Sequence, residues 1–201
     1  LWPFYKKLKS MELLNVFDPI LFILMISLYL FDLTMFEQSI CTFSIIVSYI
    51  ILRMLLRQKA KKQLQHLFAT QEIIKITVMP SLKRILFWDF VVETVNRHVA
   101  GQLGVLHPVL KIHAELPKTQ TLSTVTIQAQ KTPLGDFFTH FTPFIYFEEQ
   151  NHSHSTFVNI YDLRYIMNKE FLHHATIIFD SNKLPTASYM HSYGHTMKIP
   201  C

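Results

Sequence analysis

Two long apolar runs lie near the start of the chain: PILFILMISLYLFDLTMF over Pro19–Phe36 and ICTFSIIVSYIILRMLL over Ile40–Leu56. The first contains a single charged residue, Asp32, and the second also contains one, Arg53. Each run approaches the roughly 20 residues that an α-helix needs to cross about 30 Å of hydrocarbon. We therefore predict a membrane helical hairpin with spans at about 19–36 and 40–56. Two buried core helices of a soluble protein are the alternative.

The charges flanking these runs predict an orientation. Bases precede the first run and close the second, whereas the connector holds no base. They are Lys6, Lys7, Lys9, Arg53, Arg57, Lys59, Lys61 and Lys62. The positive-inside rule then places both ends in the cytoplasm, as expected for a multi-pass protein of the cell membrane. The lipid bilayer is the first expected partner, and the basic run would also attract anionic headgroups.

The composition supports a membrane segment and argues against a nucleic-acid partner. Only 16% of the 201 residues are charged, against about 25% in ordinary soluble domains. Residues 1–62 hold eight bases and four acids, and residues 63–201 hold eleven and ten. The net charge of +5 therefore divides into +4 and +1, so no nucleic acid is expected to bind. With four Gly and two Cys, collagen and disulfide scaffolds are excluded.

Beyond residue 62 the sequence is typical of β-structure. Val109–Leu116 alternates apolar and polar residues, as a half-buried strand does, and Asn96-Arg97 suits a tight hairpin. Strand signals occur over Glu72–Val78, Ile85–Val95, His98–Leu106, Val109–Leu116, Ile145–Glu149, Thr156–Asp162, Ala175–Asp180 and Thr186–His191. They predict an antiparallel domain of about six to seven strands.

One helical insertion interrupts this pattern between Thr121 and Phe141. Leu122, Val125 and Ala129 have helical spacing, and Asp136 is the expected cap of a short turn that ends before Pro143. The predicted fold class is thus a membrane α-helical hairpin followed by an α+β, mainly antiparallel β, cytoplasmic domain. The predicted boundary separates residues 1–62 from residues 63–201.

Several motifs, in this order and spacing, carry a resemblance to a family. They are WPF at Trp2–Phe4, NVFDPILF at Asn15–Phe22, the segment Pro80–Trp88, FFTHFTPF at Phe137–Phe144 and DLRY at Asp162–Tyr165. Over essentially the whole chain, the sequence resembles the YfhP-type membrane-bound metal-dependent hydrolases of Gram-positive bacteria. The resemblance implies a divalent metal whose ligands belong to an upstream His-rich segment of the HRG-x-TH kind.

That His-rich segment is absent from this sequence, and the chain begins with Leu1. We therefore expect the chain to be the C-terminal portion of a bacterial membrane-bound hydrolase of unknown substrate, with no metal ligands of its own. A membrane-anchored regulatory or binding module without catalysis, whose β-domain binds a cytoplasmic protein, is the alternative. An inactive remnant is a third reading.

The histidines do not predict a metal site. His173 and His174 are adjacent and would point to opposite faces of a strand, and His191 and His195 flank a loop. Glu148 and Glu149 are likewise expected on opposite faces of their strand. G-x-S-x-G, P-loop and G-x-G-x-x-G motifs are absent, so no cofactor-binding residues are predicted.

Two carboxylates remain as candidates. Asp18 precedes Pro19, which favours an N-cap with Pro at the first helical position. The alternative is a catalytic carboxylate that faces a site built by upstream helices, and Asp18 is the one catalytic candidate of the chain. Asp162 and Arg164 are expected to form a structural ion pair.

Overall fold

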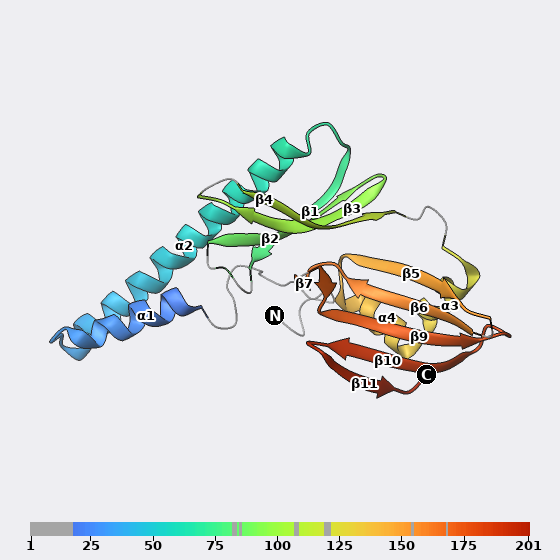
Figure 1. Ribbon diagram of the computed structural model, residues 1–201. Helices are drawn as coiled ribbons and strands as arrows, with labels where there is room; N and C mark the ends of the chain where they lie inside the picture. Colours follow the sequence, from blue (N-terminus) through green and yellow to red (C-terminus); the bar gives the residue numbers. More distant parts are fainter. Residues whose placement is uncertain are drawn as a thin grey trace. The chain divides into compact units, whose positions relative to one another are not determined.

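The computed structural model describes residues 18–81, 84, 86–106, 109–118, 122–153, 155–167 and 169–201 (Figure 1). The chain divides into two compact units, one of residues 1–90 and 102–111 and the other of residues 91–101 and 112–201. The predictions for Trp2–Phe4 and for the three N-terminal lysines lie outside the described residues.

The first unit begins with a short apolar helix. α1 (Pro19–Ser27) continues as a 3₁₀ turn, η1 (Leu28–Leu30). Asp18 is the N-cap of α1, as predicted, and its Oδ1 accepts hydrogen bonds from the amides of Ile20 and Leu21 at 3.2 and 3.4 Å. Pro19 follows at the first helical position, where its missing N–H costs nothing.

The predicted first span is wrong at its C-terminal end. Thr34 is the N-cap of α2 (Met35–Leu67), in a capping box: the Thr34 amide donates to Glu37 Oε2 at 3.0 Å, and the Glu37 amide donates to Thr34 Oγ1 at 3.4 Å. This box starts a new helix inside the apolar run, so residues 31–34, which the prediction includes in the first span, connect the two helices. The helical segment Pro19–Leu30 is then only about 18 Å long, which is short of a bilayer core.

α2 contains the predicted second span, 40–56. Within the described residues it is the one helix that is long and apolar enough to cross a membrane, and it lies near the N-terminus. Large side chains in its first half are exposed, including Phe43 at 70%, whereas Ala60 and Leu64 in its second half are completely buried. The predicted boundary at residue 62 lies inside this helix, and a separate membrane region over 1–62 stays a prediction.

A four-stranded sheet of order β1-β2-β3-β4 follows α2, and the boundary between the two units falls inside its last three strands. Within the first unit, Arg57 Nε donates to the carbonyl of Val78 at 2.9 Å, and the Arg53 guanidinium lies 4.5 Å from the ring centre of Trp88. The predicted strands are confirmed with small shifts at their ends. They are β1 (Ile73–Pro80), β2 (Phe87–Thr94), β3 (Arg97–Gly104) and β4 (Leu110–Pro117).

The predicted helical insertion consists of two short helices, α3 (Thr124–Lys131) and α4 (Pro133–Phe141). Thr132, not Asp136, is the cap: its Oγ1 accepts from the amide of Gly135 at 3.1 Å, whereas Asp136 lies in the first turn of α4. A Cβ on Gly135 would lie 1.8 Å from the carbonyl oxygen of Ala129. Glycine is therefore required for the two helices to approach each other here.

The second unit is built on a five-stranded antiparallel sheet of order β11-β10-β9-β6-β5. A pair of two-residue strands, β7 (Ile166–Met167) and β8 (Glu170–Phe171), lies between β6 and β9 in the chain. The sheet strands are β5 (Ile145–Asn151), β6 (Ser155–Asp162), β9 (His173–Asp180), β10 (Pro185–Ser192) and β11 (His195–Ile199). Of these, β11 is not foreseen by the sequence pattern.

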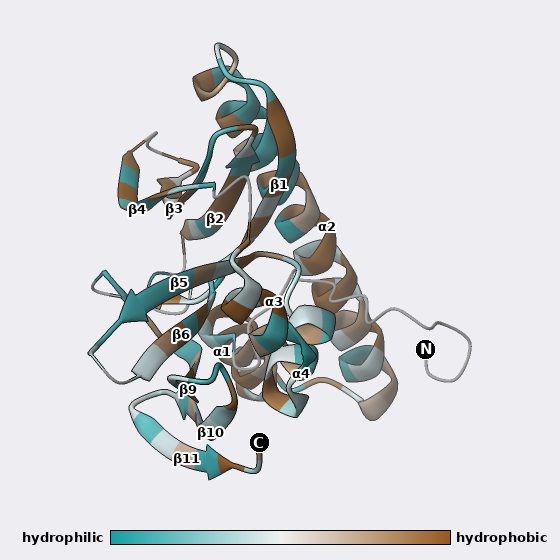
Figure 2. Cartoon of the chain, turned by 90° about the vertical axis from the view of Figure 1, so that its right-hand side faces the viewer, coloured by the Kyte–Doolittle hydropathy of each residue, from teal (hydrophilic) through white to brown (hydrophobic). Residues whose placement is uncertain are grey.

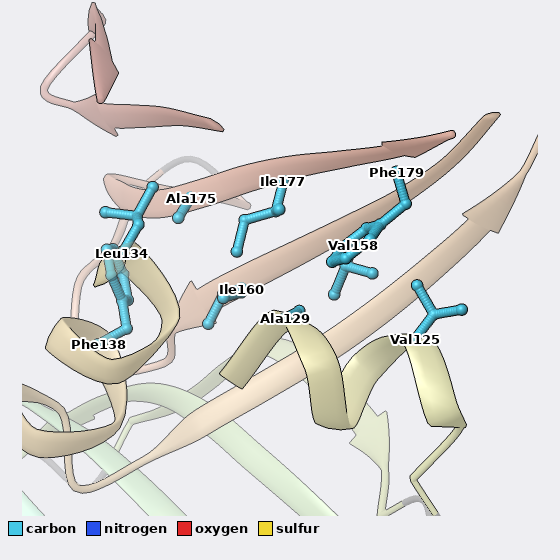
Figure 3. Close-up of a cluster of buried hydrophobic side chains, with 9 residues drawn as sticks. All are labelled: Val125, Ala129, Leu134, Phe138, Val158, Ile160, Ala175, Ile177 and Phe179. Carbon is cyan, nitrogen blue, oxygen red and sulfur yellow. The ribbon is translucent and has the colours of Figure 1, made fainter. Parts of the chain in front are cut away.

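One face of this sheet forms the core with α3 and α4 (Figure 3). The buried cluster consists of Val125, Ala129, Leu134, Phe138, Val158, Ile160, Ala175, Ile177 and Phe179. The sheet residues in it alternate along β6 and β9, so their chain neighbours lie on the opposite face.

Candidate functional site

The second unit contains a groove of about 650 Å³ on the sheet face that α3 and α4 do not cover. Every residue that lines it belongs to this unit. The floor is made by strand residues Tyr146, Glu148, Tyr161, His174, His191 and Thr196, and the sides by Leu116, Lys169, Glu170, Phe171, Leu172 and Gly194.

Five of the six floor residues form one continuous cross-strand row, with one residue from each strand of the sheet. Tyr146 on β5 pairs with Tyr161 on β6, which pairs with His174 on β9. His174 pairs in turn with His191 on β10, and His191 pairs with Thr196 on β11. Directly paired residues of neighbouring strands project from the same face, so the row places four ring side chains side by side.

The rings of the row contact one another. The imidazoles of His174 and His191 are stacked, with centroids 4.3 Å apart and an interplanar angle of 14°. Tyr161 lies 5.7 Å from His174 and 6.4 Å from Tyr146, centre to centre. Phe171, from the β8 side of the groove, lies 5.0 Å from Tyr161. The result is an aromatic platform along the groove floor.

Glu148 supplies a carboxylate beside this platform. Its Oε2 accepts from the Tyr161 hydroxyl at 2.8 Å and from Gln150 Nε2 at 3.2 Å. Burial, together with the hydrogen bond to Glu148, raises the pKa of Tyr161, so the phenol stays protonated and donates. Figure 2 shows the hydrophilic run at the C-terminal end of β5 to which Glu148 belongs.

The hydrogen bonds of His174 assign its tautomer. Its Nδ1 lies 3.1 Å from the carbonyl oxygen of Phe171. Because a carbonyl only accepts, Nδ1 carries the proton, and Nε2 of the neutral ring is an acceptor. Nδ1 of His191 lies 2.9 Å from Thr196 Oγ1. Burial, and secondarily the electrostatic influence of neighbouring His174, lower the pKa of His191, which favours its neutral form.

Two tight turns shape the sides of the groove. Tyr193 and Gly194 have φ of 47° and 81° and connect β10 to β11, where Ser192 pairs with His195. Two successive residues in the left-handed region are the mark of a type I′ hairpin turn. Lys169, at φ 70°, precedes β8. Gly194 and Lys169 both line the groove.

His173 lies outside the groove, in a separate contact set, as the alternation with His174 predicts. Its ring makes edge contacts with Tyr165 and Tyr193, at 5.1 and 4.7 Å between centres. Its Nδ1 lies 2.9 Å from Ser192 Oγ. Burial lowers the pKa of His173. These contacts fix the ring at the end of the sheet and leave it outside the lining of the groove.

The predicted pair of Asp162 and Arg164 is present and buried. Arg164 Nη2 donates to Asp162 Oδ2 at 2.7 Å, and the two side chains are 6% and 2% exposed. Thr142 Oγ1 donates to the same carboxylate oxygen at 3.2 Å. A buried pair that is satisfied in this way acts as part of the fold, in agreement with the structural role predicted for it.

Asp18, the predicted catalytic candidate, lies in the first unit and apart from the groove residues in the chain. One carboxylate oxygen caps α1. The other, Oδ2, accepts from the Tyr49 hydroxyl of α2 at 2.8 Å. Oδ1 thus has the capping role predicted for this residue, and Oδ2 connects α1 to α2. A catalytic role for Asp18 stays a prediction.

The remaining histidine pairs do not make a metal centre in the part of the chain that the structure describes. No group of three His, Cys, Asp or Glu side chains that would hold a metal ion occurs there. His152 packs its ring on Phe157, and His154 is outside the described residues. The described residues therefore do not fit the divalent metal that the resemblance implies.

The stacked pair of His174 and His191 is the feature that sequence reasoning missed. The two residues are far apart in the chain, and only the register between β9 and β10 brings them together. The adjacent pair His173-His174 and the spaced pair His191/His195 attract attention as motifs. In the structure, His173 lies outside the groove and His195 is exposed at the start of β11, so the stacked pair takes one residue from each motif.

Comparison with known families relates the second unit to one described domain. Residues 124–198 match the model of the YfhP C-terminal alpha/beta plait domain. The matched segment runs from α3 into β11 and contains the five-stranded sheet and nearly all of the groove. Of the motifs above, FFTHFTPF and DLRY lie inside it. The match therefore supports a relationship of this part of the chain to YfhP-type proteins.

No match was found among curated proteins or among solved structures.

Proposed function

We propose that this chain is a membrane-anchored binding module, in which α2 fixes the chain in a bilayer and the groove of the second unit binds a ligand. The observation that carries the proposal is the aromatic platform, a row of ring side chains along the floor of a groove of about 650 Å³. Ligand pockets have volumes of roughly 300–1,000 Å³, with aromatic walls and a few oriented polar groups. The groove has each of these properties.

The anchor and its orientation form the second half of the proposal. The bases Arg57, Lys59, Lys61 and Lys62 follow the apolar part of α2, and the connector 31–34 contains Asp32 and no base. The positive-inside rule then puts the C-terminal side of α2 in the cytoplasm. A two-span hairpin would require the first crossing to use more than Pro19–Leu30, because these twelve residues are too short to span.

A second candidate function is the one implied by the resemblance, a bacterial membrane-bound metal-dependent hydrolase of unknown substrate. The match of residues 124–198 to the YfhP C-terminal domain favours it. In this reading the divalent metal and its ligands lie outside the described residues, and the groove binds a regulatory ligand or a cytoplasmic protein partner.

The anchor is tested by extraction and by thiol labelling. The full chain, expressed in a bacterial host, should stay with the membrane pellet at alkaline pH. Cys201 is exposed at the C-terminus, so in a Cys41→Ser variant it should react with a membrane-impermeant maleimide only after the cells are opened. Extraction into the soluble fraction, or labelling of intact spheroplasts, would contradict the anchor or its orientation.

The groove is tested by blocking it. Thr196 lines the groove, whereas its neighbour Met197 is exposed and lies on the other side of β11. The full chain in detergent is screened by thermal shift against soluble small molecules of all charge types. Stabilising compounds should lose their effect in Thr196→Trp and keep it in Met197→Trp. Equal effects on both variants would contradict binding in the groove.

A further inference from the structure

The groove is lined by more acidic than basic side chains, which favours a cationic ligand. Glu148 and Glu170 line it, and Lys169 is the one lysine or arginine among the lining residues. Within the described part of the chain, neither carboxylate takes part in an ion pair. Both bonds to Glu148 use Oε2, so Oε1 keeps its accepting capacity for a ligand.

Two other polar groups of the floor, on Tyr161 and His174, already use their donors. The Tyr161 hydroxyl already donates to Glu148. The Nδ1–H of His174 already donates to Phe171, which leaves Nε2 as an acceptor. A ligand rich in N–H donors would satisfy the remaining acceptors on these two residues and on Glu148.

The aromatic rings of the groove also attract cations. The faces of Tyr and Phe carry negative potential and attract cations that lie over them within about 6 Å. Tyr146, Tyr161 and Phe171 all line the groove, and Tyr161 contacts both of the other two rings. A flat cation would stack on this platform and reach the Glu148 carboxylate with its N–H groups.

We propose that the groove binds an organic cation, a guanidinium, amidinium or primary ammonium group, with Glu148 as its counter-ion and the Tyr146–Tyr161–Phe171 platform as its stacking surface. This inference rests on the proposed function only for the groove, and it is independent of the anchor in the membrane. The His174 Nε2 acceptor contributes a further contact for the N–H groups of the ligand.

Three flat probes of equal shape and different charge test the class of ligand. Benzamidinium, benzamide and benzoate are titrated against the full chain in detergent at pH 7.5, and binding is followed by saturation-transfer NMR. Benzamidinium should bind at least about tenfold more tightly than benzamide, because a charge-assisted hydrogen bond contributes roughly that factor. Benzoate should bind most weakly of the three.

A neighbouring glutamate provides the matched control. Glu149 follows Glu148 on β5 but faces the other way, where its Oε2 accepts from Ser123 of the α3 cap. Glu148→Gln should lower the affinity for benzamidinium about tenfold and abolish its preference over benzamide, and Glu149→Gln should do neither.

Three results would overturn the proposal: equal binding of the probes, a preference for benzoate, or the same loss in both glutamine variants. Failure to detect benzamidinium binding would overturn it too. If benzamide or benzoate binds and Thr196→Trp removes that binding, the groove function stands and only the cation class fails. Release of the chain from the membrane would instead contradict the anchor alone.

Discussion

The two faces of the five-stranded sheet are built from the same strands but differ in packing. One face packs against α3 and α4, and the other lines the groove. On the covered face, Val158, Ile160, Ala175 and Ile177 are completely buried against α3 and α4. On the opposite face, their chain neighbours Tyr161 and His174 line the groove. Burial of apolar side chains stabilises the fold, so the face against α3 and α4 secures the sheet. The opposite face is only partly packed, because Tyr146, Tyr161 and Phe171 line the groove and also pack against a smaller buried cluster.

The largest difference between the faces should appear when two neighbouring isoleucines of β9 are truncated. Ile177 is fully buried in the core cluster, whereas Ile178 pairs with Phe157 on the opposite face and is only half-buried. Ile177→Ala should lower the free energy of unfolding of the second unit by about 3 kcal/mol, because it removes buried methyl groups and leaves a cavity. Hydrogen exchange of the β9 amides measures this loss.

Ile178→Ala is the internal control for this comparison. It deletes the same atoms one position further along the strand and should cost about 1 kcal/mol, because the side chain is only half-buried and its loss leaves a smaller cavity. Equal losses of protection in the two variants would mean that both faces are packed, and would contradict the division between a core face and a recognition face.

Acidification should have an intermediate effect on the free energy of unfolding, because it protonates histidines of the second unit. His98, His173 and His191 each have a pKa below the ordinary value of 6.5, and burial is the largest cause at each. The unfolded chain therefore binds more protons than the folded unit once the pH falls below about 6.5. Stability should be constant above this pH and decrease below it, before the carboxylates titrate.

Urea unfolding at pH 7.5, 6.5 and 5.5 measures this dependence. His191→Gln keeps a polar side chain on the platform but removes one of the three titrating groups, so the loss between pH 6.5 and 5.5 should become smaller. A midpoint that does not change over this range, or a variant with the same dependence as the parent chain, would show that burial of these rings does not control their protonation.

Much of the fold could be predicted because local pattern and tertiary structure agree. The alternation over Val109–Leu116 corresponds to β4, the Asp18-Pro19 pair caps α1, and the helical spacing before Phe141 corresponds to α3 and α4. In each case the residues that decide the structure are close in the chain, so their spacing alone carries the information.

The errors have physical causes of two kinds. Hydropathy does not distinguish a continuous span from an apolar run that a capping box divides, so the start of α2 at Met35 was missed. The ring platform and β11 depend on the register between distant strands, which no short window contains. The sequence places His173 and His174 on opposite faces of their strand, but it could not show that His174 stacks on His191 across β9 and β10.

The smallest expected loss of stability comes from removing the Tyr161 hydroxyl, which tests the polar contact of the platform apart from its ring contacts. Tyr161→Phe keeps the ring beside Tyr146, Phe171 and His174 and removes only the hydroxyl that donates to Glu148. Because this partly exposed hydrogen bond is recovered in part by water, the loss of unfolding free energy should be about 1 kcal/mol. Tyr146→Phe removes a hydroxyl without a hydrogen bond to the described residues and should cost only a few tenths of that. Hydrogen exchange of β6 in the two variants gives the difference. If the two costs are equal, the hydroxyl of Tyr161 does not stabilise the platform, and the rings alone determine the shape of the open face.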